Sequence, residues 1–397
     1  MNDQCPICGT NVTNEFLKRD KVPVHQNFLF EEEQDAINIK RGALRICICS
    51  YCGFVFNSDF DESLMSYNEN YENTQSYSPV FEKYLDDSID YLVNQRGVKN
   101  SRIIEVGCGK GHFLQKLVER GENSGCGFDP SYIGPLEKLN GRLIFKKNYY
   151  DESSSDLVAD IIICRHVIEH IGNPLGMLGT IRRALANSSH AKVFFETPDV
   201  EWMLRNQVIW DFFYEHCSYF SAPSIRLAFE KSGFILDDLK TIFGNQYLWI
   251  EAHPAVEPII LAHNNVDNLI KFSYDFSDAN AELISLWKEK LMEISSLGNI
   301  AIWGGGAKGV TFANMFDPKK DLFSCIIDIN PQKQNKFLPG TGHPIVGYHE
   351  LLQKNIKSVV ILNPNYRHEI ENLLEASGAN DITVYEFVSG VENENHY

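Results

Sequence analysis

The sequence lacks the features that would assign it at once to membranes, secretion or nucleic acid. No apolar run approaches the length of a membrane span, and the polar, cysteine-bearing segment Met1–Thr10 lacks the charged and apolar regions of a signal peptide. Positive charge is also scarce, because 36 Lys and Arg stand against 53 Asp and Glu, for a formal net charge of -17. We therefore expect a cytoplasmic protein that binds neither membrane nor nucleic acid, since phosphate recognition needs a basic surface.

What remains is the composition of an ordinary globular protein. A chain of 397 residues that is 44% apolar and 22% charged can bury two or three cores, so we expect several domains. Without a secretory signal, its ten cysteines are better explained as metal ligands and buried thiols than as disulfides.

Two C-x-x-C units near the N-terminus are typical of a zinc site. Cys5 and Cys8 form the first and Cys49 and Cys52 the second, and a glycine follows each unit. Four thiolates complete a tetrahedral zinc shell with no open position, so we assign this metal to folding and not to catalysis. Cys47 offers a competing C-x-C register, and the linking segment is longer than in the commonest zinc ribbons.

A glycine loop after a short apolar run predicts a cofactor site. Residues 102–106 suit a buried parallel strand, and 112–120 suit the helix that follows the loop. The third glycine comes two residues after the second, not three as in dinucleotide-binding loops, and Glu105 precedes the loop. This spacing is typical of a site for S-adenosylmethionine. The glycines concerned are Gly107, Gly109 and Gly111.

An acidic residue about twenty positions later strengthens this interpretation. Asp129 ends the apparent second strand, 125–129, where a carboxylate can accept the two ribose hydroxyls. A third strand is expected to end near residues 150–151. A fourth, 160–164, leads to His166 and His170 at the carboxyl edge of the sheet, and His166 is a candidate cofactor contact.

The chain then repeats the pattern. After a polar segment at 236–245 and a linker-like helix at 281–295, a strand at 299–303 leads into Gly304–Gly309, which matches G-x-G-x-x-G, and Asp328 follows about twenty residues on. This fits NAD, but Lys308 in the turn would equally meet the phosphates of a nucleotide sugar. Arg367, after the strand at 359–362, is a second candidate phosphate contact.

Taken together, these motifs make the sequence similar to the nucleotide-sugar C-methyltransferases, such as the 3-C-methyltransferases that build branched deoxysugars like mycarose and tetronitrose. The resemblance covers nearly the whole chain. Its further elements are His170, Tyr214-Glu215-His216, Trp303-Gly-Gly-Gly-Ala-Lys308 and the segment from Lys333 to Pro344.

The resemblance implies a catalytic set. A histidine placed like His216 removes a proton from the carbon beside a ketone, which suits imidazole because its pKa lies near neutrality. Glu215 would orient that ring if its side chain folds back toward it, and His170 and Tyr214 would donate to the enolate oxygen. Tyr71 is our choice of sugar-facing phenol.

Two positions differ from the family pattern. Phe213 stands where relatives carry a tyrosine two residues before the glutamate, and the tyrosine cluster ahead of the first glycine loop is spread over Tyr67, Tyr71 and Tyr77. Either Tyr67 or Tyr77 therefore remains an alternative to Tyr71.

The sequence thus predicts an α/β protein with two Rossmann-type three-layer domains behind a small zinc module. The expected parts are 1–66, the zinc-binding domain; 67–245, the S-adenosylmethionine-dependent methyltransferase domain; and 246–397, the substrate-binding domain. We expect a C-methyltransferase for a keto-deoxy nucleotide sugar, working as a monomer or weak homo-oligomer. The alternatives are an O- or N-methyltransferase, an NAD-dependent oxidoreductase and a non-catalytic scaffold.

Overall fold

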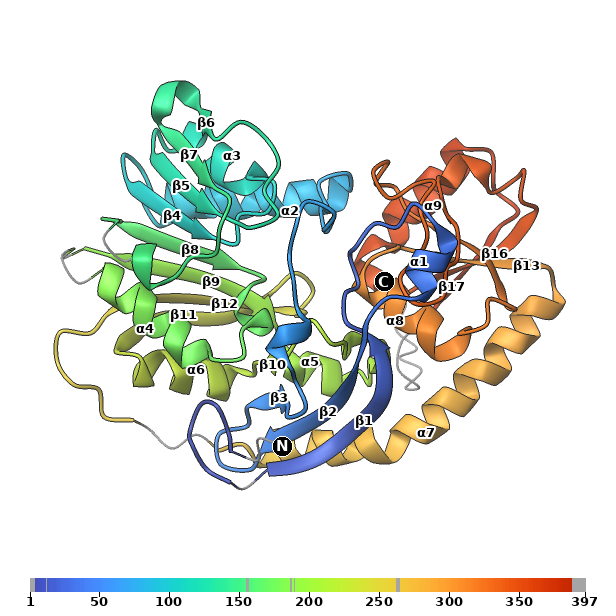
Figure 1. The fold of residues 1–397 in the computed structure, drawn as a ribbon, viewed down its shortest axis with the longest axis horizontal. Coiled ribbons are helices and arrows are strands. Elements are labelled where there is room, and N and C mark those ends of the chain that lie inside the picture. The colour runs from blue at the N-terminus through green and yellow to red at the C-terminus, as the bar shows by residue number, and fades with distance from the viewer. Residues whose placement is uncertain are drawn as a thin grey trace.

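The fold consists of two α/β lobes joined by a narrow antiparallel sheet. The computed structural model describes residues 4–11, 13–154, 157–185, 188, 190–261 and 265–387. Figure 1 shows the lobe in greens and teals beside the lobe in orange and red, with the long hairpin of the N-terminal sheet below and between them. Among these residues no helix is long and apolar enough to cross a membrane.

The larger lobe is built on an eight-stranded sheet in the order β11-β12-β9-β8-β4-β5-β7-β6. Its central strands are parallel, and their buried residues form near-continuous apolar runs, as expected for a sheet covered on both faces. The strands are β4 (Arg102–Val106), β5 (Ser124–Phe128), β6 (Glu137–Lys138), β7 (Leu143–Lys146), β8 (Ile161–Arg165), β9 (Lys192–Pro198), β11 (Phe234–Ile242) and β12 (Tyr247–Pro254).

Local sequence signals start the helices of this lobe. The Ser78 hydroxyl accepts the Phe81 N–H at the start of α2, and the Asn173 side chain accepts the Gly176 N–H at the start of α4. In both helices proline follows the cap, where its fixed φ suits the first turn. The helices are α2 (Pro79–Asp90), α3 (His112–Arg120), α4 (Pro174–Ala184), α5 (Val200–Arg205) and α6 (Ala222–Lys231).

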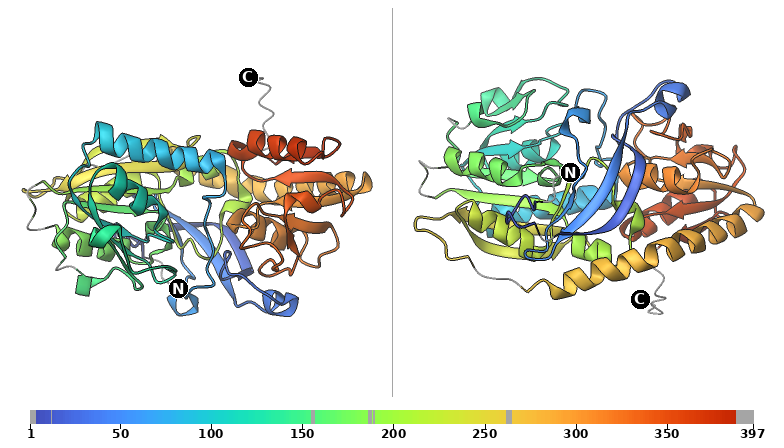
Figure 2. Two further views of the ribbon diagram at one scale, coloured as in Figure 1. Left: turned by 90° about the horizontal axis from the view of Figure 1, so that it is seen from above. Right: turned by 60° about the horizontal axis from the view of Figure 1, so that its bottom comes forward.

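The smaller lobe has a five-stranded parallel sheet in the order β15-β14-β13-β16-β17. The 30-residue helix α7 runs along the edge of the molecule into this lobe, as the right-hand view in Figure 2 shows. The elements are α7 (Asp267–Ser296), β13 (Asn299–Trp303), α8 (Ala307–Phe316), β14 (Phe323–Ile327), β15 (Ile345–Val346), β16 (Ile356–Ile361), α9 (Arg367–Ala376) and β17 (Thr383–Glu386).

The N-terminal sheet takes strands from two distant parts of the chain. Its order is β1-β2-β3-β10, and β10 lies some 160 residues after β3, where Tyr219 pairs with Val55. Phe16 of this sheet meets Phe276 of α7 edge to face, with ring centroids 5.9 Å apart. The elements are β1 (Thr13–Pro23), α1 (Glu33–Ile37), β2 (Arg41–Cys49), β3 (Val55–Asn57) and β10 (Ser218–Tyr219).

The fold class predicted from the sequence is confirmed: both α/β units are present, with strands β4 and β13 and helix α3 at the expected residues. Three local predictions are wrong. The third strand, β7, ends at Lys146; residues 234–242 form strand β11; and the linker helix begins at Asp267. The proposed boundary at 245 also falls inside the hairpin of β11 and β12, because β12 completes the larger sheet.

Candidate active site

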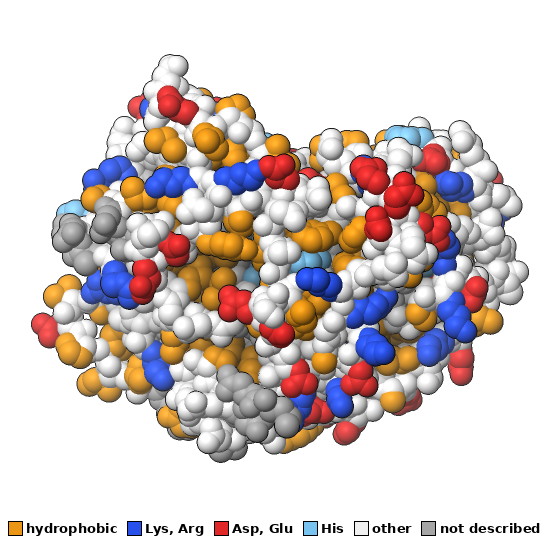
Figure 3. All heavy atoms as spheres, viewed as in Figure 1, with side chains coloured by type: hydrophobic (Ala, Val, Ile, Leu, Met, Phe, Trp, Pro, Cys, Tyr) orange, Lys and Arg blue, Asp and Glu red, His pale blue; other side chains and the backbone are white. Residues whose placement is uncertain are grey.

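One large cavity, of about 1050 Å³, lies between the two lobes. The residues after β4 and β8 line it from the larger lobe, and the turn after β13 lines it from the smaller lobe. Strand order reverses between β4 and β8 and again between β13 and β16, and ligands bind at such switch points. Figure 3 shows a notch between the lobes, with apolar side chains and a histidine at its floor.

The first glycine loop follows β4 as predicted. Gly107, Gly109 and Gly111 all have positive φ, which L side chains rarely adopt. A Cβ at Gly111 would lie 2.3 Å from the Phe145 ring, whereas a Cβ at Gly109 would meet nothing within 4 Å. Gly111 is therefore needed for packing, and Gly109 borders the open space where a cofactor would lie.

Asp129 is joined directly to this loop. The Gly109 N–H donates to Asp129 Oδ2 over 2.8 Å, and the Ser131 hydroxyl donates to Asp129 Oδ1 over 2.6 Å. An ionised carboxylate has about four acceptor positions, so Asp129 retains capacity for ribose hydroxyls. It lines the cavity.

Glu105 fits the cationic end of S-adenosylmethionine. Its side chain is 3% exposed, and its Oε2 atom is buried without a hydrogen-bond partner at the cavity wall. Burial raises the pKa of Glu105 to about 8, although nearby Arg165 opposes the shift. A buried, unpartnered carboxylate oxygen suits an ammonium group, so Glu105, Gly109 and Asp129 together fit the methionine and ribose ends of this cofactor.

His166 takes part in a buried ionic cluster. Its Nε2 lies 2.8 Å from Glu196 Oε1, and Arg165 Nε lies 2.8 Å from Glu196 Oε2. Burial lowers the pKa of His166, but Glu196 and Glu169 outweigh it and raise that pKa to about 9. His166 also has a φ of 54°, which is uncommon for a residue with a side chain. It lines the cavity as a fixed cation rather than as a base.

Glu215 does not orient His216. Its carboxylate accepts the Tyr71 hydroxyl over 2.6 Å and the Gln26 N–H over 2.5 Å, and His25 Nδ1 lies 3.7 Å away. Burial raises the pKa of Glu215, but His25, His170 and Tyr71 outweigh it and leave the pKa below its ordinary value. The prediction of a Glu215–His216 pair is therefore wrong, since Glu215 is already held by the N-terminal segment and Tyr71.

His216 lies against a second histidine. The His170 and His216 rings meet edge to face with centroids 4.7 Å apart, and Phe213 covers His216 with ring centroids 4.1 Å apart. Burial lowers the pKa of His216 well below its ordinary value, and His170, His166 and Lys308 lower it further. His216 is thus a neutral imidazole on the cavity wall, which is the form a base requires.

Two of the three candidate tyrosines lie within hydrogen-bond distance of other cavity residues. Tyr71 hydrogen-bonds Glu215, and the Tyr67 hydroxyl lies 3.1 Å from His170 Nδ1. Burial, and next the charge of Glu215, raise the pKa of both phenols well above the ordinary value, so both stay protonated. Tyr77 lines the same cavity but is 44% exposed.

Tyr214 does not reach the cavity, and its predicted catalytic role is wrong. Its hydroxyl accepts the Asp61 N–H over 2.9 Å, and its ring packs on Phe60 with centroids 5.5 Å apart. A Cβ at Gly42 would lie 2.2 Å from this ring, so Gly42 provides the space that the ring fills. Tyr214 is a core residue between β2 and the segment before β10.

The second glycine turn repeats the geometry of the first. The Gly305 N–H donates to Asp328 Oδ2 over 2.8 Å, the same length as the bond between Gly109 and Asp129. Here lysines are added: Lys333 Nζ lies 3.9 Å from Asp328, and Lys308 forms an ion pair with buried Asp211 of the larger lobe. Both lysines line the cavity, and the phosphate contact of Lys308 stays a prediction.

Arg367 points away from the cavity, so its predicted phosphate contact is wrong. Its guanidinium pairs with Glu371 and Glu386 at 2.9 and 3.0 Å on the outer face of α9 and β17. Helix α9 begins at Arg367. Residues two positions apart on a helix point in different directions, so Arg367 and Glu369 lie on different faces of α9. Glu369 is on the inner face, where it accepts the Ser78 hydroxyl over 2.6 Å.

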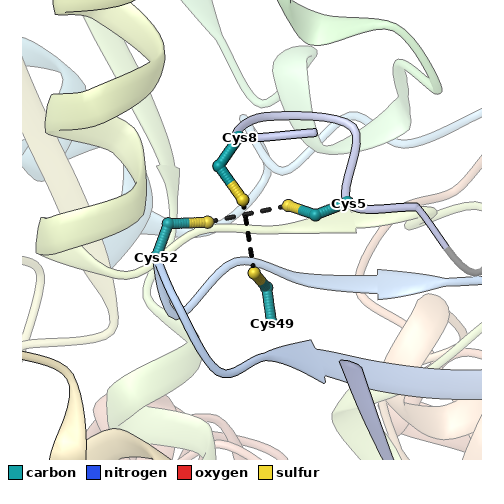
Figure 4. A group of neighbouring side chains, drawn as sticks. All are labelled: Cys5, Cys8, Cys49 and Cys52. Atoms are coloured by element: carbon teal, nitrogen blue, oxygen red, sulfur yellow. Dashed lines mark hydrogen bonds between the residues drawn. The ribbon is translucent and has the colours of Figure 1, made fainter. Parts of the chain in front are cut away.

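The four cysteines of the two C-x-x-C units converge. Cys5 and Cys52 sulfurs lie 3.6 Å apart and Cys8 and Cys49 sulfurs 3.4 Å apart, and all four lie within 4.8 Å of one another (Figure 4). This donor set fits tetrahedral zinc. Cys47 lies outside the group, near Ser58 at 3.6 Å, so the C-x-x-C register prevails over C-x-C.

Other cavity and near-cavity residues were not anticipated from the sequence. His25 and Asn27 come from the N-terminal segment, Asp211 and Trp202 from the segment after β9, and Glu169 stands beside His170. None of them lies in a sequence motif. Only Glu169 could have been suspected from the sequence, because it directly precedes His170, a predicted site residue.

Comparisons with known proteins agree with this geometry. Residues 78–239 match the family described as a methyltransferase domain, and residues 261–384 match the C-methyltransferase C-terminal domain. The chain is therefore an S-adenosylmethionine-dependent methyltransferase. It is 21% identical over 387 residues to the C-methyltransferase NovU of Streptomyces niveus, covering 93% of this chain and 91% of that one.

Three further similar proteins cover less than half of the chain. A tRNA U34 carboxymethyltransferase of Helicobacter acinonychis (strain Sheeba) is 29% identical over 106 residues, but the chain spans only 40% of its length and the match covers 24% of this chain. Among solved structures, a 1,6-didemethyltoxoflavin-N1-methyltransferase of Burkholderia thailandensis gives a TM-score of 0.34 at 14% identity, covering 43% of this chain and 78% of that one. A magnesium protoporphyrin IX methyltransferase of Synechocystis gives 0.35 at 15%, covering 44% and 83%.

Proposed function

We propose that this methyltransferase methylates a carbon beside the ketone of a keto-deoxy nucleotide sugar, with His216 as the base. The observation that carries the proposal is the single cavity that joins the first glycine loop, neutral His216 and the second glycine turn. The similarity to NovU along almost the whole chain, including the C-methyltransferase C-terminal domain, supports transfer to carbon.

Different residues of the cavity would hold the cofactor, remove the proton and stabilise the enolate. Glu105, Gly109 and Asp129 would hold S-adenosylmethionine, which supplies an electrophilic methyl group when bound. A ring nitrogen of His216 accepts the proton of the substrate carbon, and the electron pair of that C–H bond becomes the enolate. Tyr67, held by His170, stays protonated and can donate to the enolate oxygen.

The second glycine turn is suited to the diphosphate of the substrate. Helix α8 begins there, so backbone N–H groups face the cavity, and Lys308 and Lys333 add positive charge. An NAD-dependent reaction is less well supported, because residues 261–384 match a C-methyltransferase domain. We further propose that the four-cysteine group binds a structural zinc ion.

Replacement of the base tests the proposal. We expect His216→Asn to lower the methylation rate by about 10²- to 10⁴-fold, because general-base catalysis contributes that much. The assay uses a panel of 4-keto-6-deoxy nucleotide sugars with mass-spectrometric detection of one added methyl group. Exchange of the substrate proton with D₂O should fall in parallel, while the affinity for S-adenosylmethionine stays within about twofold.

Residual activity of His216→Asn within a few-fold of the original protein would refute the role of the base. If instead a panel hydroxyl gains the methyl group and no carbon-bound proton exchanges, the O-methyltransferase alternative is correct. The affinity for NAD, measured in the same preparation, tests the oxidoreductase alternative.

A further inference from the structure

The carboxylate nearest to the histidine pair is Glu169, which the predicted catalytic set leaves out. Its side chain is 2% exposed and lies at the start of the segment that follows β8. One oxygen, Oε2, accepts the Thr197 hydroxyl over 3.0 Å. The other, Oε1, lies 3.5 Å from His166 Nδ1 and has no hydrogen-bond partner among the described residues.

His216 also has a ring nitrogen without a hydrogen-bond partner among the described residues. Its Nδ1 atom is buried and has no partner among the residues that the structure describes. One ligand atom each of Glu169, His170 and His216 lie within 4.8 Å of one another. A carboxylate oxygen of Glu169 therefore lies within 4.8 Å of a ring nitrogen of His216, and each side chain has a buried polar atom without a partner among the described residues, which costs free energy.

An imidazole base needs one nitrogen free and the other held as N–H. Because the two nitrogens share one proton in the neutral ring, an acceptor at Nδ1 leaves Nε2 free to accept a proton. Glu215 is directed toward Tyr71, Gln26 and His25, and it is not part of the group that Glu169 forms with the two histidines. His170 cannot provide a negative charge.

We propose that Glu169 is the positioning carboxylate of His216: it accepts the Nδ1–H of that ring and balances the imidazolium formed when Nε2 takes the substrate proton. The proposal rests on the proposed role of His216 as base. During the step the proton moves from carbon to Nε2, the C–H electron pair stays on the substrate, and the charge of Glu169 is unchanged. In this role Glu169 acts through His216.

A metal ion is the other arrangement that two histidines and a carboxylate allow. The surroundings disfavour it, because Arg165 and protonated His166 already place two positive charges next to Glu169 and Glu196. Tyr67 also occupies His170 Nδ1. The metal alternative is kept as an outcome of the test.

The test needs no known sugar substrate. Protein labelled with ¹⁵N-histidine and saturated with S-adenosylhomocysteine is studied by NMR, with the His216 signals assigned by their loss in His216→Asn. We expect the Nδ1–H tautomer of His216 in the original protein. In Glu169→Gln we expect the pKa of His216 to fall by about one unit, because the imidazolium loses its counter-charge.

The titratable and charged groups near His216 are Glu169, His170, His166, Lys308 and Tyr219, so controls must separate their effects. Glu169→Asp keeps the charge and should restore the tautomer in part. Thr197→Val removes the other partner of the same carboxylate but leaves its charge, and should change the pKa of His216 by less than about 0.3 unit. Affinity for S-adenosylhomocysteine and the melting temperature show whether each variant is folded.

An unchanged tautomer and pKa in folded Glu169→Gln would overturn the proposal. A paramagnetic shift of the His216 and His170 signals on adding one equivalent of Co²⁺, beyond the metal held by the four cysteines, would also overturn it in favour of a metal site. Should Glu169→Gln be unfolded, Glu169→Asp and the tautomer of the original protein decide. Failure of His216→Asn to lose activity would refute the base but leave this NMR result intact.

Discussion

At the scale of residues, the neighbours of each buried group decide the protonation states in the active site. Glu105 is protonated near neutral pH, His216 is neutral and His166 is charged, although all three line the same cavity. The difference arises from their partners: His166 has two carboxylates, His216 has positive neighbours, and one oxygen of Glu105 has no partner. Sequence identifies the residues but not these partners.

Glu105 gives a prediction that depends on the sign of its pKa shift. With a pKa of about 8 in the free protein, Glu105 is mostly protonated at pH 7. A cationic amino acid group beside it stabilises the carboxylate and lowers its pKa, so binding of S-adenosylmethionine should release up to about one proton. Calorimetry at pH 7 in buffers of different ionisation enthalpy measures that number.

Glu105→Gln serves as the matched control, since it keeps the shape of the side chain and cannot ionise. It should bind S-adenosylmethionine without proton release. At pH 9 the original protein should also release fewer protons than at pH 7, because Glu105 is already ionised above its pKa. Equal release by both proteins would show that another group titrates.

At the scale of elements, the loop between β4 and α3 contains two glycines with different roles. Gly111 is needed for packing, and Gly109 borders the open space of the cavity. We expect Gly111→Ala to lower the free energy of unfolding by about 2–4 kcal/mol, because its Cβ would lie 2.3 Å from Phe145. Gly109→Ala has no such clash and should cost about 1 kcal/mol from its left-handed backbone alone.

The affinity for S-adenosylmethionine should be affected in the opposite order, with the larger loss in Gly109→Ala and the smaller in Gly111→Ala. Gly109→Ala places a methyl group in the space next to Asp129, so we expect S-adenosylmethionine affinity to fall by tenfold or more in a protein that still melts cooperatively. Denaturant unfolding and calorimetric titration of both variants check the pair. Wild-type affinity in Gly109→Ala would place the cofactor elsewhere.

The elements predictable from sequence are those with local signals. The glycine loop, α3 and the buried strands β4 and β13 follow from spacing, caps and apolar runs. Strand β11 was not predicted because its sequence is polar and half-exposed, and only pairing with β12 makes it a strand. Likewise the adjacency of Glu215 and His216 implied a pair, but contacts with His25 and Tyr71 decide where Glu215 points.

At the scale of the whole molecule, the four-cysteine group holds the N-terminal residues against the larger lobe. Ile7, between Cys5 and Cys8, accepts the Lys231 ammonium over 2.8 Å at the end of α6. The cysteines and their neighbours also share a core with β8 and β9. Loss of a bound metal should therefore disturb more than the N-terminal hairpin.

We expect about one zinc ion per chain in the purified protein, and removal by a strong chelator should lower the melting temperature by several degrees, since metal affinity adds directly to folding stability. Cys52→Ser should have the same effect without chelator, whereas Cys47→Ser, outside the group, should retain the metal. Elemental analysis and thermal unfolding measure both. A metal content well below one per chain would refute the site.

The pairing of β10 with β3 has a consequence for recombining such enzymes. Phe213, Glu215 and His216 line the cavity, and the chain just after them is hydrogen-bonded to the N-terminal sheet, with Ser218 opposite Phe56. If only the first sixty residues were exchanged between related enzymes to transfer substrate specificity, β10 would have to pair with a β3 strand from another protein. The segments that form this part of the active site are far apart in the sequence. The N-terminal sheet and the segment around β10 must therefore be exchanged together.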